Sequence, residues 1–127
     1  MPKNKGSEDK GTAKKSSRIG MARVGTSVVL TPKESLTFKN CEDLENMYKE
    51  LISKKNTNLL LDCKSLSFLD SKALELLLQM QEELEQQGGS LKMFGLNSVC
   101  RDILLVTRLI NIFHVHQDIQ DALKRES

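Results

Sequence analysis

Tryptophan is absent from this chain of 127 residues, which has one tyrosine and four phenylalanines. Leucine must therefore fill most of the core. The chain also lacks an apolar run close to the roughly 20 residues that a membrane-spanning helix needs, and its N-terminus lacks the apolar segment of a signal peptide. A chain of this length supports one domain and hardly two. We therefore expect a single cytoplasmic domain with no membrane insertion.

Cysteine and histidine are scarce. The three cysteines, Cys41, Cys63 and Cys100, follow no spacing typical of a metal site or a disulfide framework, which fits a reducing compartment. Each is expected to be a small buried residue. The alternative is a redox sensor, since the position of Cys100 early in a predicted helix favours a lowered pKa.

Motifs for catalysis and cofactor binding are also missing. Ser71 lies at a strand–loop–helix junction, but it lacks the glycines of the G-x-S-x-G elbow. The pair Gly88-Gly89 precedes a strand instead of a helix, so it indicates a helix end and no phosphate loop. His114 and His116 are the only histidines, and no acid or cysteine at a clear spacing completes a metal site with them. We expect no catalytic residue, cofactor or metal, and hence no enzyme.

Charge separates the chain into two parts. Residues 1–23 carry a net charge of +5 against +2 for the whole chain, so residues 24–127 carry −3. A basic tail of this kind binds nucleic acid or acidic membranes in some proteins. Because no aromatic residue interleaves the lysines, we favour a disordered basic leader over residues 1–22 and no direct nucleic-acid binding. The folded domain is predicted to span residues 23–127.

Hydrophobic periodicity predicts alternating strands and helices. Val24–Leu30 and residues 36–38 are expected to be strands, and a helix containing Leu44 to Ile52 follows Asn40 as its cap. The further expected elements are a strand over residues 57–62 that is buried on both faces, a helix over residues 71–87, a strand over residues 90–94 with Lys92 facing solvent, a helix capped by Asn97 or Ser98, a strand over residues 112–115 and a closing helix around residues 119–123. This order predicts an α/β fold with a mixed, mostly parallel sheet.

The pair Asp70-Ser71 opens the helix that follows the buried strand. One interpretation is a helix cap, in which either side chain accepts from free backbone N–H groups. The other is a phosphoacceptor, because the helix dipole and the N–H groups stabilise a phosphate at a helix N-terminus. Phosphorylation there adds nearly two negative charges to the surface around Ser71, which would expel a docked partner. The local sequence leaves both interpretations open.

Four sequence segments in order resemble the STAS domain family, which is named for sulfate transporters and anti-sigma factor antagonists. The resemblance covers about residues 24–125. Residues 59–71 resemble the apolar strand, loop and terminal Asp-Ser of the family, and the leucines from Leu74 onward resemble the following helix. The remaining similar segments are residues 89–96, residues 107–113 and residues 121–123.

The resemblance implies the compact STAS fold, with about four helices mainly on one side of the sheet. For stand-alone members it implies an anti-sigma factor antagonist, a signalling protein that regulates transcription by partner switching. Such a protein binds an anti-sigma factor that is also a serine kinase, is released by phosphorylation, and is restored by a serine phosphatase. Transferred to this chain, Ser71 is the phosphorylation site. The implied partner-binding residues are Asp70, Ser71, Lys72, Ala73 and Leu74.

The chain departs from the family pattern directly after Ser71. Lys72 replaces a small hydroxyl residue and Ala73 replaces a glycine. Alanine suits a helix better than glycine, so the fold should tolerate it. Two other roles of lone STAS domains remain open, an accessory subunit of an ABC lipid transporter and a scaffold of the stressosome type.

Overall fold

The computed structural model describes residues 19–124, which form one five-stranded sheet and four helices. The strands are β1 (Ile19–Val24), β2 (Ser27–Pro32), β3 (Asn58–Asp62), β4 (Ser90–Phe94) and β5 (His114–His116), and they lie in the sheet in chain order. The helices are α2 (Cys41–Ser53), α3 (Ser71–Gln86), α4 (Ser98–Val106) and α5 (Ile119–Lys124). The mixed α/β class is therefore confirmed, and so is the predicted order of strands and helices from α2 onward.

The N-terminal hairpin differs from the prediction. Gly25 and Thr26 form a two-residue turn inside the predicted strand Val24–Leu30, and Gly25 has a φ of +63° that glycine adopts easily. Strands β1 and β2 pair antiparallel, whereas the pairs from β2 to β5 are parallel. Because β1 begins at Ile19, residues 19–22 belong to the sheet, and the predicted boundary at residue 23 was wrong. The rest of the predicted basic leader lies outside the described residues.

Two other short strands were misplaced. Residues 36–38 form no strand, and only Leu36 makes an isolated bridge, to Leu69. The last strand begins at His114, two residues later than predicted, because the chain still turns after α4, where the Phe113 N–H donates to the Leu109 carbonyl at 3.1 Å. These segments are short, so tertiary hydrogen bonds outweigh local propensity.

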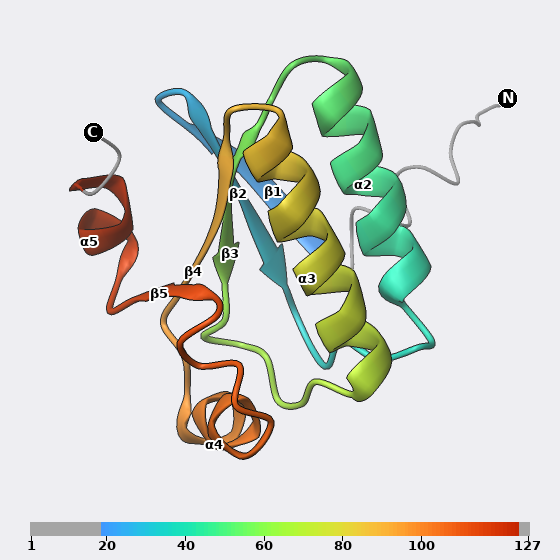
Figure 1. Cartoon of the computed structure of the whole chain (residues 1–127), viewed down its shortest axis with the longest axis vertical. Coiled ribbons are helices and arrows are strands. Elements are labelled where there is room, and N and C mark those ends of the chain that lie inside the picture. The colour runs from blue at the N-terminus through green and yellow to red at the C-terminus, as the bar shows by residue number, and fades with distance from the viewer. Residues whose placement is uncertain (1–18, 125–127) are drawn as a thin grey trace, which may run out of the picture.

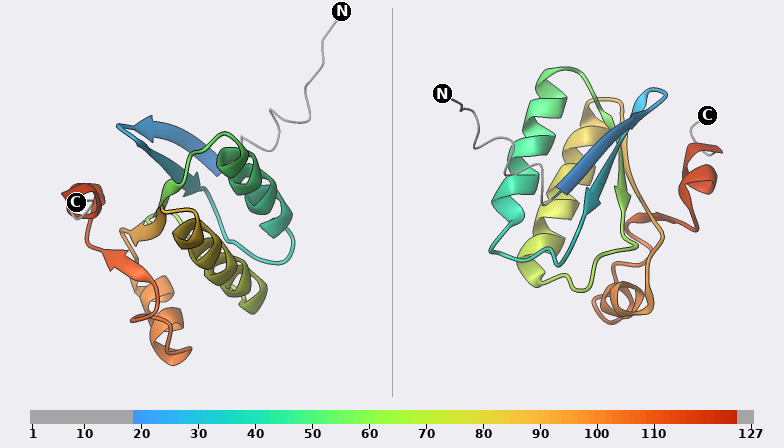
Figure 2. Two further views of the ribbon diagram at one scale, coloured as in Figure 1. Left: turned by 45° about the horizontal axis from the view of Figure 1, so that its top comes forward. Right: turned by 180° about the vertical axis from the view of Figure 1, so that it is seen from behind.

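Leucines form the main core between the sheet and helices α2 and α3 (Figures 1 and 2). Leu59, Leu60 and Leu61 of β3 are each at most 1% exposed, as expected for a strand covered on both faces. Helix α3 ends as predicted, since Gly88 has a φ of +85° and the Gly89 N–H donates to the Leu84 carbonyl at 2.8 Å. A Cβ on Gly89 would lie 1.9 Å from the Thr57 carbonyl oxygen, so glycine is required there.

Helix α5 covers the opposite face of the sheet (Figure 2). A smaller apolar cluster lies beneath it, formed by Val29, Leu60, Phe94 and Ala122. Lys92 lies on this same face and is only 8% exposed, so the prediction that it faces solvent was wrong. Strand periodicity separated the two faces of β4 correctly, but it carries no information about what covers each face.

Candidate functional site

Asp70 caps helix α3. Its backbone is extended, with φ −96° and ψ 179°, and its Oδ1 accepts from the Ala73 N–H at 2.9 Å. An ionised carboxylate at this position satisfies a free N–H group and is favoured by the helix dipole. Because Asp70 does the capping, the hydroxyl of Ser71 is not needed to hold the start of the helix.

Asp70 also joins two loops. Its Oδ2 accepts from the Phe38 N–H at 2.9 Å, and its own N–H donates to the Leu36 carbonyl at 3.2 Å. The Leu36 N–H in turn donates to the Phe68 carbonyl at 3.0 Å. The loop before α2 and the loop before α3 are therefore held side by side.

The five predicted partner-binding residues divide by burial. Ser71 and Lys72 are exposed, and Asp70 is partly exposed. Ala73 is 1% exposed and Leu74 is 7% exposed, so both side chains belong to the core. Of the five predicted partner-binding residues, only residues 70–72 are therefore accessible to a partner. The methyl group of Ala73 fills the core and does not change the surface, which leaves Lys72 as the exposed departure from the family pattern.

Two exposed aromatic side chains flank Asp70, and the sequence analysis missed both. Phe38 is 70% exposed and Phe68 is 47% exposed. With Asp70 and neighbouring polar residues they line a hollow of about 420 Å³. Phe68 lies within the quoted motif, but no periodicity distinguishes an exposed phenylalanine in a loop from a buried one. Exposed aromatic side chains are typical of protein interfaces.

Helix α4 lies at the same end of the molecule (Figure 1). Asn97 caps it, as one of two predicted candidates, with its Oδ1 accepting from the Cys100 N–H at 2.9 Å. The amide group of Asn97 also donates to the carbonyls of Leu66 and Cys63 in the loop before α3. This helix exposes Val99, Leu105 and Val106 at 46%, 51% and 80%. Helix α4 therefore adds exposed apolar side chains at this end of the molecule.

The histidines lie away from Ser71. His114 Nε2 contacts Glu85 Oε2 at 2.9 Å, near the C-terminal end of α3. Glu85 follows Ser71 by 14 residues, about 21 Å along a helix, so His114 cannot act as a base for Ser71. His116 Nδ1 lies 3.2 Å from Asp121 Oδ2 of α5, also away from Ser71. Over residues 19–124 no cluster of three or more metal-ligating side chains is found.

The cysteine thiols are buried. The pKa of Cys41 is raised to about 11, mainly by burial and also by the nearby carboxylate of Asp70, while the charge of Lys72 acts in the opposite direction. Burial also raises the pKa of Cys63 and of Cys100. The expectation that each cysteine is a small buried residue is therefore confirmed. The alternative, a lowered pKa of Cys100 at the helix N-terminus, is contradicted, because burial disfavours the thiolate.

The fold and the site together define a small α/β domain whose exposed chemistry lies at a helix terminus and two adjoining loops. The chain belongs to the STAS domain family, whose model matches residues 18–122. No curated protein sequence matches it. In the described part of the chain, no helix has the length and apolar character to cross a membrane.

Solved structures of anti-sigma factor antagonists share this fold. A Mycobacterium paratuberculosis antagonist superposes with a TM-score of 0.75 at 18% identity, covering 85% of this chain and 92% of that one. A Thermotoga maritima protein proposed to be an antagonist gives a TM-score of 0.80 at 19% identity, covering 85% and 93%. The Bacillus cell fate determinant SpoIIAA in its phosphorylated form gives 0.65 at 20% identity, covering 84% and 97%. At these identities the similarity establishes the fold alone.

Proposed function

We propose that the protein is an anti-sigma factor antagonist that binds a serine-kinase anti-sigma factor and is released when Ser71 is phosphorylated. The observation that carries the proposal is the exposed Ser71 hydroxyl at the first position of α3, beside a cap that Asp70 already provides. Similar folds belong to antagonists, one of which is solved in a phosphorylated form. The protein acts in this proposal by binding, without catalysis of its own.

The geometry explains how a phosphate would switch binding without unfolding the domain. A phosphate on Ser71 would lie at the positive end of the dipole of α3, which favours the dianion. It would also place nearly two negative charges beside Asp70, next to the apolar side chains of Phe38 and Phe68. A partner that covers these side chains would have to desolvate the phosphate, so binding would be lost while the fold remains.

The contact surface in this proposal comprises the exposed residues 71–72 and the two aromatic side chains, Phe38 and Phe68. Asp70 acts mainly as a positioning residue, because both of its carboxylate oxygens accept from backbone N–H groups of this chain. Within residues 19–124, the one ion pair of Lys72 is a long, exposed contact with Glu75 at 4.0 Å, so Lys72 is available to a partner at little cost to stability.

A pair of matched serines allows a controlled test. Ser98 follows the cap Asn97 as Ser71 follows Asp70, and both serines are exposed at the first position of a helix. Full-length chains with Ser71→Ala, Ser71→Asp or Ser98→Asp serve as baits in the native cytoplasm. We expect the Ser71→Ala and Ser98→Asp baits to recover a serine-kinase anti-sigma factor, and the Ser71→Asp bait to bind it at least about 100-fold more weakly, or about 2.7 kcal/mol.

Phosphate transfer supplies the second measurement. The recovered kinase with ATP should modify the wild-type chain at Ser71 and leave the Ser71→Ala chain unmodified, as read by mass spectrometry. A serine phosphatase should then restore binding. Equal recovery of one partner by all three baits would contradict the switch. A partner that is an ABC ATPase would assign the chain to a transporter instead, and a megadalton assembly would indicate a scaffold.

A further inference from the structure

Polar side chains from three neighbouring strands meet on the face of the sheet that α5 covers. The pairing places Asn58 of β3 opposite Ser90 of β4, and Lys92 of β4 opposite His114 of β5. His116 lies two residues further along β5, so it shares this face with His114. The sheet register therefore brings together five hydrogen-bonding side chains that are widely separated in the sequence.

Helix α5 covers only part of this face. Its six residues pack over Leu60 and Phe94, with Ala122 fully buried against them. The beginnings of β3 and β4 are left uncovered, and a hollow of about 350 Å³ lies there. Its lining comprises Asn58, Gly88, Gly89, Ser90, Lys92, His114 and His116. A second hollow of about 340 Å³ adjoins the same two histidines and Asp121.

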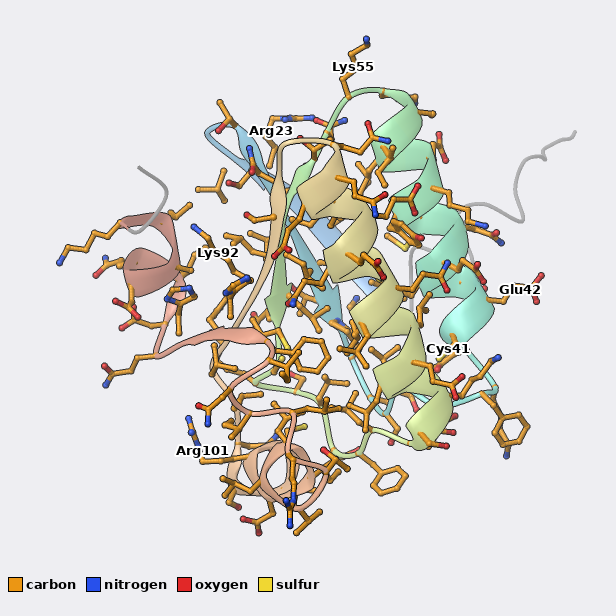
Figure 3. All side chains as sticks on the ribbon, in the orientation of Figure 1. Arg23, Cys41, Glu42, Lys55, Lys92 and Arg101 are labelled. Atoms are coloured by element: carbon orange, nitrogen blue, oxygen red, sulfur yellow. The ribbon has the colours of Figure 1, made fainter. Side chains whose placement is uncertain are left out.

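Lys92 lines this hollow, and its side chain lies between the sheet and α5 (Figure 3). The residue is 8% exposed, and its Nζ donates to the Ala122 carbonyl at 3.0 Å. Lysine is almost never buried to this extent unless its ammonium group has polar partners. The hydrogen bond to Ala122 holds α5 against the sheet. Holding α5 does not require the other polar side chains that line the hollow, so they call for a separate explanation.

The two histidines add directed ring nitrogens. The carboxylates of Glu85 and Asp121 accept hydrogen bonds, so the contacts are satisfied by hydrogen on Nε2 of His114 and on Nδ1 of His116. These tautomers would leave the opposite ring nitrogens as acceptors. The side chain of His116 is 9% exposed, so its ring is held in place. The hollow thus combines the donors of Lys92, Ser90 and Asn58 with acceptors on the two rings.

We propose that this hollow binds the phosphate group of a small phosphorylated molecule. Lys92 supplies the charge, Ser90 and Asn58 donate to phosphate oxygens, and a ring nitrogen of His114 or His116 accepts from the P–OH group of the monoanion. A hydrogen phosphate group has the mixture of acceptors and a donor that this lining matches, whereas a sulfate has acceptors only. His114 contacts Glu85 near the C-terminal end of α3, 14 residues along that helix from Ser71, so the site is separated from Ser71 and independent of its proposed role.

The test uses the isotope-labelled full chain and inorganic phosphate as the probe, with chemical shifts read by NMR. We expect saturable shifts at residues 90–92 and 114–116, with weaker binding of sulfate at matched ionic strength. Lys92→Met should weaken phosphate binding at least about tenfold, and Ser90→Ala about threefold. Lys64→Met is the matched control, because this lysine is exposed near the opposite end of β3, and it should leave binding unchanged.

Two results would overturn the proposal. One is the absence of saturable shifts in the wild-type chain, and the other is equal phosphate affinity in Lys92→Met, Ser90→Ala and the control. Equal binding of sulfate would reject the phosphate assignment. If Lys92→Met fails to fold because α5 detaches, Ser90→Ala and His114→Gln decide the question, since neither side chain contacts α5 in the hydrogen bonds of the described residues.

Discussion

Helices α3 and α4 begin in nearly the same way, and the comparison shows what a helix cap does and does not reveal. Asp70 and Asn97 are both extended, both accept from the N–H group three residues later at 2.9 Å, and both precede an exposed serine. They differ in their second contacts. Asp70 accepts from Phe38, whereas Asn97 donates to the carbonyls of Leu66 and Cys63.

The surroundings therefore distinguish the two serines more than the caps do. The cap before Ser71 is a carboxylate that lines a hollow together with two exposed aromatic side chains, whereas the cap before Ser98 is an amide that holds a neighbouring loop. A capping motif alone predicts the start of a helix. The candidate regulatory site is defined by the two loops that Asp70 holds together.

Exchanging the two caps should give the largest change in stability. In Asn97→Asp the carboxylate keeps the cap but faces the Leu66 and Cys63 carbonyls without a donor. We expect the free energy of unfolding to fall by about 2–3 kcal/mol, as for a broken buried hydrogen bond. Urea denaturation measures it. An unchanged midpoint would show that the amide contacts to the loop contribute nothing.

The reciprocal change, Asp70→Asn, tests the second oxygen of Asp70. The Oδ1 cap can persist, but an amide nitrogen would face the Phe38 N–H, donor against donor. We expect a loss of about 1–2 kcal/mol in unfolding free energy and increased hydrogen exchange at Phe38. Exchange at Phe38 that matches the wild type would contradict the proposed junction of the two loops.

Truncating the aromatic side chains should affect binding more than folding. Phe38→Ala and Phe68→Ala should each weaken binding of the recovered partner by about 1–2 kcal/mol, because aromatic side chains often contribute most of the binding energy of an interface. Since both side chains are exposed, unfolding free energy should change by no more than about 0.5 kcal/mol. Met21→Ala, an exposed apolar residue on β1, is the control and should leave partner binding unchanged. Unaltered binding in both phenylalanine variants would remove these side chains from the contact surface.

The smallest expected effect concerns Cys41, beneath the start of α3. Its pKa of about 11 in the folded chain exceeds the ordinary value of 9.0. The folded state therefore holds the thiol proton more tightly, and its contribution to stability is complete below pH 9 and is lost as pH rises from 9 toward 11. In Cys41→Ala the free energy of unfolding should therefore fall less between pH 8 and pH 11 than in the wild type, as measured by urea denaturation. An equal fall in the two chains would contradict this prediction.

Periodicity and end signals predicted the long elements well. The apolar residues of α3 at helical spacing, with Asp70 before them and Gly88 after them, located that helix to within a residue. The short segments were predicted incorrectly because they lack such a repeating pattern. Residues 36–38 and β5 have too few residues for a period, and their structure depends on hydrogen bonds to distant parts of the chain.

The sequence by itself determined the order of elements from α2 onward, the mixed sheet and the position of Ser71 at a helix start, because these follow from local patterns and their periods. Tertiary structure decided which polar side chains are exposed and which meet. It buried Ala73 and Lys92, exposed Phe38 beside Asp70, and aligned three strands so that Asn58, Lys92 and His114 share one face. Such outcomes depend on strand register and on what covers each face, and neither is encoded in a local window of sequence.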